Sequence, residues 1–107
     1  MTIFDKRRAG FEAKFVRDQE ALFRATARRN KLVGHWAAQK LGYVDDDAEQ
    51  YAQEAVKSAF QPAGDEQLVG KISNDFNKYR VETPRRRIRQ KLREMMNVAL
   101  RQLASNQ

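Results

Sequence analysis

Any chemistry in this sequence would have to come from a few side chains, and its only histidine, His35, is the first to consider. His35 stands next to Trp36 in a helical stretch, and the chain has no cysteine and no second histidine that could share a metal with it. A glycine-rich phosphate loop, a G-x-S-x-G elbow and paired-carboxylate spacing are all missing from the sequence. We therefore expect His35 to be partly buried on a helix face, and the protein not to be an enzyme.

Three consecutive aspartates, Asp45 to Asp47, form the only dense acidic run. Neither a glycine nor a distal glutamate stands at the spacing of an EF-hand loop, so we expect no calcium or other metal site. The run favours a helix start instead. One aspartate would cap free amide groups, the others would lie at the positive end of the helix dipole, and Asp46 with Glu49 has roughly capping-box spacing.

The run PRRRIRQKLR is the other cluster that could bind a ligand, through Arg85, Arg86, Arg87 and Arg89. The first three would lie in the opening turn of a helix, where the dipole disfavours cations by a few tenths to about 1 kcal/mol each. Two interpretations stay open. The arginines form a solvated face partly neutralised by acidic helices, which we prefer, or they form an anion site that binds ATP or ADP weakly. No other cofactor is expected.

Four segments with helical periodicity would position these groups. The first is predicted over 11–41, and the second over 47–60 with Tyr51, Ala52, Ala55 and Phe60 on one face. The third begins after a cap at Asp65, and the fourth opens with Thr83 as N-cap and Pro84 as first helical residue. Gly42 is placed to end the first helix. No stretch alternates with the period of two that a strand needs, so we predict an all-α, four-helix bundle-like single domain.

The first predicted helix is uneven along its length. Its apolar stripe is dense from Leu32 to Leu41, where we expect Trp36 to be largely buried, and sparse over 1–21. Residues 1–18 are therefore predicted to be a flexible or projecting segment, and residues 19–107 the helical domain. Such a segment suits an anchor that folds on binding, although a helix that folds back onto the domain remains the alternative. The candidate anchor residues are Phe4, Phe11 and Phe15 with a polar rim of Glu12, Lys14 and Arg17.

The net charge of +7 over 107 residues is unevenly distributed. Residues 1–31 carry nine basic and four acidic side chains (+5), residues 32–79 four and eight (−4), and residues 80–107 eight and two (+6). An acidic middle between basic ends argues against a uniform surface for polyanions such as DNA, and favours a protein partner. No apolar run reaches the length of a membrane span, and the N-terminus lacks the apolar core of a secretory signal. We expect a cytoplasmic protein without membrane insertion.

Three stretches together carry a family resemblance: FEAKF at 11–15, ARRNKLVGHWAAQKLG at 27–42 and AGDEQLVGKI at 63–72. The chain resembles the zeta subunit of alphaproteobacterial F-type ATP synthases over nearly its whole length. The resemblance implies a small four-helix regulatory subunit, a monomer when free, that inhibits ATP hydrolysis. Its N-terminal segment would enter the catalytic interface between the alpha and beta subunits and reach the gamma subunit. It would thus associate with the membrane-bound synthase through the catalytic head.

A second class of function remains open on the residues alone. The basic ends of the chain also fit a helical protein that binds nucleic acid or nucleotides. Binding to polyphosphate should weaken steeply as salt rises, whereas an interface anchored by aromatic rings should weaken less. Salt dependence therefore separates the two interpretations.

Overall fold

The structure is made of helices, as the sequence periodicity predicts. The computed structural model describes residues 19–60 and 64–105, and within these ranges it contains helices and no strand. The helices are α2 (Gln19–Leu41), α3 (Asp45–Ser58), α4 (Asp65–Lys78) and α5 (Arg85–Ser105). The prediction of an all-α, four-helix domain is confirmed. The predicted segment 1–18, including the first eight residues of the helix expected over 11–41, lies outside the described residues.

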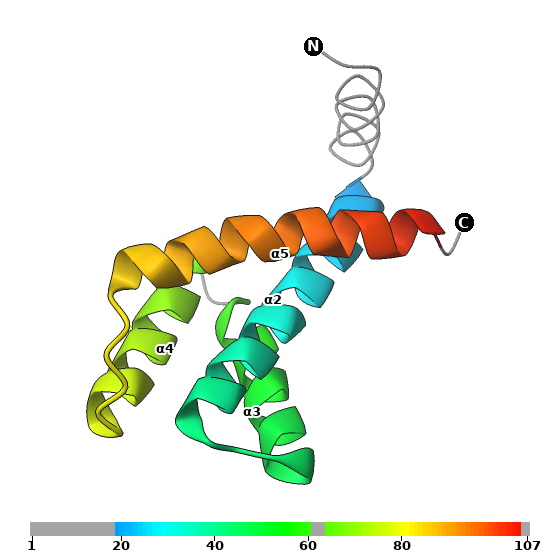
Figure 1. The fold of residues 1–107 in the computed structure, drawn as a ribbon. Coiled ribbons are helices and arrows are strands. Elements are labelled where there is room, and N and C mark those ends of the chain that lie inside the picture. The colour runs from blue at the N-terminus through cyan, green and yellow to red at the C-terminus, as the bar shows by residue number, and fades with distance from the viewer. Residues whose placement is uncertain (1–18, 61–63, 106–107) are drawn as a thin grey trace.

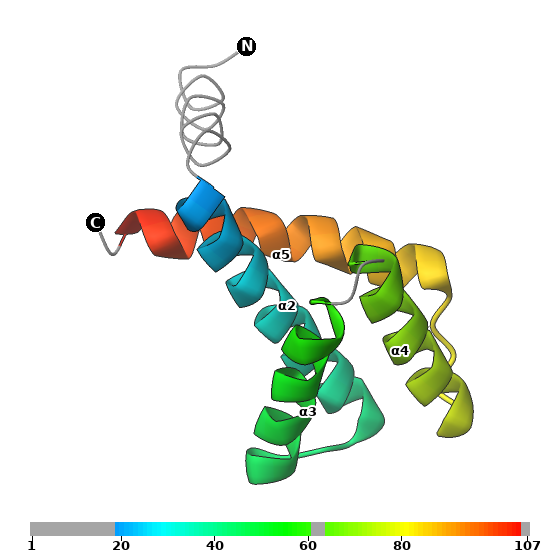
Figure 2. The same ribbon diagram turned by 180° about the vertical axis from the view of Figure 1, so that it is seen from behind.

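Helix α2 is the element on which the others pack. Helix α3 turns back beside it, and α5 runs across both α2 and α4 (Figures 1 and 2). All four helices contribute to the main core, which consists of Val33, Ala37, Ala38, Tyr51, Ala55, Leu68, Val69, Ile72, Phe76, Ile88 and Leu92. A second, smaller cluster joins the first turns of α2 to the end of α5 through Ala21, Ala25 and Leu100, with Met96 and Leu103 beside them.

The turn after α2 is the one that Gly42 predicts. The amide of Tyr43 donates to the carbonyl of Ala38 at 2.9 Å, and the amide of Gly42 donates to the carbonyl of Gln39 at 3.1 Å. Gly42 has a φ of 85°, which glycine adopts without the steric cost that a side chain would add. These two bonds form a Schellman motif and satisfy the last carbonyls of α2.

The predicted aspartate caps are wrong. Helix α3 begins at Asp45, two residues earlier than predicted, and its N-cap is Val44 without a side-chain cap bond. All three aspartates therefore lie inside the first turn, where their negative charges interact favourably with the helix dipole. None of them occupies the N-cap position, from which a side chain would accept a bond from the free amides. The N-cap of α4 is likewise Gly64, and Asp65 is the first helical residue. Its carboxylate binds an arginine of α2 instead, as described below.

Helix α5 begins one residue later than predicted. The carbonyl of Pro84 accepts bonds from the amides of Arg87 at 3.0 Å and Ile88 at 3.4 Å, so Pro84 takes the N-cap position. Its missing amide costs no bond at this position, because the groups before the first turn have no helical acceptor. The arginine run thus starts at the first residue of the helix.

Trp36 is only partly buried, which corrects the prediction that it would be largely buried. Its ring meets the fully buried ring of Phe76 edge to face, with centroids 5.8 Å apart. The outer side of the indole is covered by cations: Lys40, Arg87 and Lys91 lie 5.6, 5.9 and 5.7 Å from its centroid. Charged side chains from α5 thus cover the indole at the point where the sequence suggested a wholly apolar environment.

Deletion of residues 1–18 is expected to leave the fold intact. Each of the four helices buries its apolar face against another described helix, and most of the helical stability of a domain comes from such packing. The truncated chain should keep a cooperative thermal transition and its helical circular dichroism. Loss of most of the helical signal would instead make these residues a structural part of the domain.

Candidate partner-binding surface

The anchor residues predicted from the sequence lie just before the described part of the chain. They are Phe4, Phe11, Glu12, Lys14, Phe15 and Arg17, and the structure does not describe them. It does describe the residues that follow. Helix α2 is described from Gln19, so its first turns are the part of the helical domain next to the predicted anchor segment.

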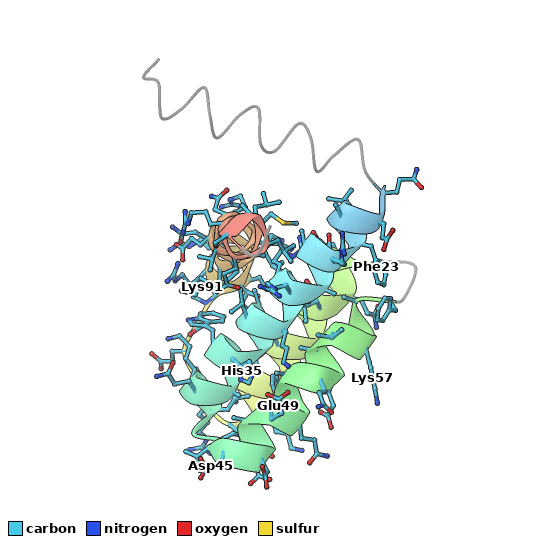
Figure 3. The ribbon with its side chains drawn as sticks, turned by 90° about the vertical axis from the view of Figure 1, so that its right-hand side faces the viewer. Phe23, His35, Asp45, Glu49, Lys57 and Lys91 are labelled. Atoms are coloured by element: carbon cyan, nitrogen blue, oxygen red, sulfur yellow. The ribbon has the colours of Figure 1, made fainter. Side chains whose placement is uncertain are left out.

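An exposed apolar patch lies on these first turns of α2. The side chain of Phe23 is 56% exposed and that of Phe60, just after α3, is 60% exposed. Their rings lie 5.6 Å apart, and Leu22, the neighbour of Phe23 in the chain, is exposed as well. Figure 3 labels Phe23 near the start of α2. We call Leu22, Phe23 and Phe60 the aromatic patch. Apolar groups that gather on a surface in this way are typical of interaction sites.

The sequence placed Phe60 wrongly and gave no role to Phe23. Phe60 was expected on the buried face of the second helix, but α3 ends at Ser58, and Phe60 has left the helix and its buried face. Phe23 is one position away from the apolar stripe that includes Leu22. Its position off the predicted stripe was the available signal, although Leu22 on that stripe is exposed as well.

The arginine run divides into two pairs. Arg85 and Arg86 are exposed, and no ion pair joins either to another residue of the described ranges. Arg87 donates to Glu94 at 3.1 Å, and Arg89 donates two bonds of 3.0 Å to the carboxylate of Glu66. A nucleotide phosphate would therefore have to compete with two glutamates. Weak binding of ATP or ADP at this turn stays a prediction.

His35 lies between α2 and α3, partly buried as predicted (Figure 3). Its Nε2 is 3.1 Å from Glu49, and Lys31 pairs with the same carboxylate at 3.0 Å. Within the described ranges, no three residues of the metal-ligating types gather closely enough to hold an ion. The histidine thus lies beside the ion pair of Lys31 with Glu49, which joins α2 to α3.

A buried arginine connects α2 to α4, and sequence reasoning missed it. Arg29 is 7% exposed, and its guanidinium donates two bonds to the carboxylate of Asp65, one of them 3.2 Å long. Its Nε donates to Asn30 at 3.0 Å. Bidentate pairing of this kind fixes geometry as well as charge. The pair holds the start of α4 against α2, and the 36 residues between Arg29 and Asp65 hide it from any local pattern.

Three glutamates make the stability of the domain depend on pH. The pKa of Glu49 is lowered by Lys31, that of Glu66 by Arg89, and that of Glu94 by Arg87, each first through a hydrogen bond. A carboxyl group whose pKa is lower in the folded state stabilises the fold above its unfolded pKa, and this contribution is lost as pH falls through the folded value. Because these groups are exposed, the contribution should be modest and screened by salt.

Urea unfolding is therefore expected to show a lower midpoint at about pH 3 than at about pH 6. Protonation of the three glutamates begins to remove the negative partner of each ion pair over this interval. The variant Glu49→Gln with Glu66→Gln and Glu94→Gln should show a smaller change in midpoint between the two pH values. Equal changes in the variant and the wild type would assign the acid sensitivity to other carboxylates.

No helix in the described part of the chain is long and apolar enough to cross a membrane.

Comparison with known proteins identifies the family. One solved structure, described as a solution NMR structure, is 40% identical in sequence to this chain. The match covers 79% of this chain and 96% of the solved chain, and the two structures superpose with a TM-score of 0.70. The search of curated proteins gave no match. The family model of the ATPase inhibitor subunit zeta matches residues 1–102, which include the predicted anchor segment as well as all but the end of α5. The chain therefore belongs to the ATPase inhibitor subunit zeta family.

Proposed function

We propose that this protein inhibits ATP hydrolysis by an F-type ATP synthase through insertion of residues 1–18 into the catalytic interface between the alpha and beta subunits. The observation that carries the proposal is the family match, because it names an ATPase inhibitor and extends over residues 1–102. In this mechanism the inserted segment reaches the gamma subunit. The four described helices stay outside the interface and hold the segment in place.

Two groups of apolar residues support these separate roles for the segment and the helical domain. Phe11 and Phe15 are four residues apart, so in a helix they share one face, with Glu12, Lys14 and Arg17 around it. The aromatic patch lies a few residues further on, at the start of α2. An inserted segment and an apolar patch at its base would bury contiguous apolar area against the synthase. Aromatic residues of this kind supply much of the binding energy in protein interfaces.

The proposal is tested with purified synthase from the source bacterium. The full chain should reduce steady-state ATP hydrolysis, and it should retain the alpha and beta subunits in an affinity pull-down. The chain lacking residues 1–18 should keep its fold and lose inhibition. Equal inhibition by both chains would show that insertion is not the mechanism, and absence of the catalytic subunits from the pull-down would contradict the proposal as a whole.

A further inference from the structure

A groove on α2 combines an apolar floor with a basic rim. It has a volume of about 600 Å³ and runs along one face of the helix, between the end of α3 and the end of α5. Its lining residues are Arg24, Ala27, Arg28, Lys31, Leu32, His35, Val56, Gln102 and Leu103. The apolar members are partly buried and form the floor, whereas Arg24 and Lys31 are exposed at the rim. Figure 3 shows the corresponding side of the molecule, with His35 labelled on α2.

The rim of this groove is basic and incompletely neutralised. No carboxylate is among the lining residues. Lys31 and His35 share the carboxylate of Glu49, but Arg24 and Arg28 form no ion pair with any residue in the described ranges. Arg29, on the same helix, is by contrast paired with Asp65. Two guanidinium groups with no carboxylate partner among the described residues therefore lie above an apolar floor, and they give the groove a local excess of positive charge.

We propose that this groove binds an acidic, amphipathic helix of a partner protein. From Arg24 to His35 the groove follows about 17 Å of α2, which matches roughly three turns of a second helix. A helix in such a groove buries its apolar face on the floor while its flanking carboxylates meet the rim. Charge complementarity would speed association and reject basic partners. This inference stands independently of whether residues 1–18 insert into the synthase.

Other occupants fit the groove less well. The segment 1–18 carries five basic and three acidic side chains, so its net charge of +2 opposes the rim (basic Lys6, Arg7, Arg8, Lys14, Arg17; acidic Asp5, Glu12, Asp18). In a second copy of this chain the acidic helix α3 already buries its apolar face in its own core. Single-stranded nucleic acid binds by stacking bases on aromatic rings, and the lining contains no phenylalanine, tyrosine or tryptophan.

The test uses a fluorescent synthetic helix of roughly 15 residues, with leucine on one face and glutamate on the rest. Its anisotropy is titrated with the full chain alone, without synthase. The glutamate peptide should bind at least about tenfold more tightly than the same peptide with lysine in place of glutamate, since several rim contacts change sign. A peptide with glutamine in place of leucine should also bind more weakly, because it cannot cover the apolar floor. Equal binding of the glutamate and lysine peptides would overturn the proposal.

Matched charge variants locate the contact. Arg24→Glu with Arg28→Glu should weaken binding of the glutamate peptide about tenfold. Arg80→Glu with Arg93→Glu makes the same change in net charge at exposed arginines outside the groove, and it should have a much smaller effect. Equal losses in the two variants would attribute binding to net charge alone and overturn the site. Tighter binding of an oligouridylate than of the glutamate peptide, lost in the first variant, would assign the groove to nucleic acid and also overturn the proposal.

Discussion

Replacing Phe11 and Phe15 together with alanine is expected to abolish most of the inhibition of ATP hydrolysis while leaving the melting temperature of the helical domain unchanged. In the proposed mechanism both rings enter the catalytic interface, where buried aromatic anchors typically contribute about 2 kcal/mol or more each. Losing both should weaken inhibition roughly a hundredfold or more. The measurement is the concentration of the variant that halves hydrolysis by purified synthase.

The anchors must contribute this much because ordering a chain segment is costly. A segment that orders on binding loses about 1 to 2 kcal/mol of backbone entropy per residue. Rim charges in water recover little of that, since exposed ion pairs contribute about 0 to 1 kcal/mol. Buried rings are therefore expected to contribute more to the binding free energy than the charges at the rim.

The matched control replaces basic residues of the same segment. Lys6→Ala with Arg7→Ala removes two charges and no ring, so it should weaken inhibition far less than the phenylalanine variant. It should mainly change how inhibition depends on salt. If the double phenylalanine variant inhibits as strongly as the wild type, these rings are not the anchors.

Gly34→Ala is expected to destabilise the domain by about 1 to 3 kcal/mol, although alanine is the better helix former. A methyl group at Gly34 would lie 2.8 Å from the Cα atom of Ala52 and 2.9 Å from the Cβ atom of Ala55. Neither neighbour has a side chain that can rotate away, so α2 and α3 would have to move apart. In a domain of this size, a loss of 1 kcal/mol lowers the melting temperature by roughly 4 to 8 °C.

Gly70→Ala provides the internal control, because it makes the same chemical change in the middle of α4. A methyl group there meets no atom within 4 Å, so only the gain in helix propensity remains. That variant should be more stable than the wild type by about 0.5 to 1 kcal/mol. Thermal melts of the two variants should shift in opposite directions. A stabilising Gly34→Ala would show that the crossing of α2 and α3 can widen without cost.

The sequence by itself determined the features that depend on neighbouring residues. Apolar periodicity predicted the helices and the absence of strands, and Gly42 predicted the turn that ends α2. These signals are local, because a helix needs only one apolar face and a turn needs only one residue that accepts a positive φ. The resemblance in the stretches 11–15, 27–42 and 63–72 likewise identified the family that the comparison confirmed.

Tertiary structure decided everything that depends on how the helices cross. The sequence predicted Asp65 to cap α4, but the crossing of α2 and α4 brings its carboxylate to Arg29. A bidentate bond to a charged guanidinium is stronger than a bond to the free amides of α4. The sequence predicted Trp36 to be a core residue, but the packing of α5 places the cations Arg87 and Lys91 over its ring.

The groove also exists only because α3 and α5 end beside the same face of α2. Its floor combines Leu32 with Val56 and Leu103, which are far apart in the chain. Periodicity predicts which face of a helix is apolar. It does not predict which other helix packs on that face, or which part of the face stays exposed. Those contacts depend on crossing geometry, which only the packing of all four helices fixes.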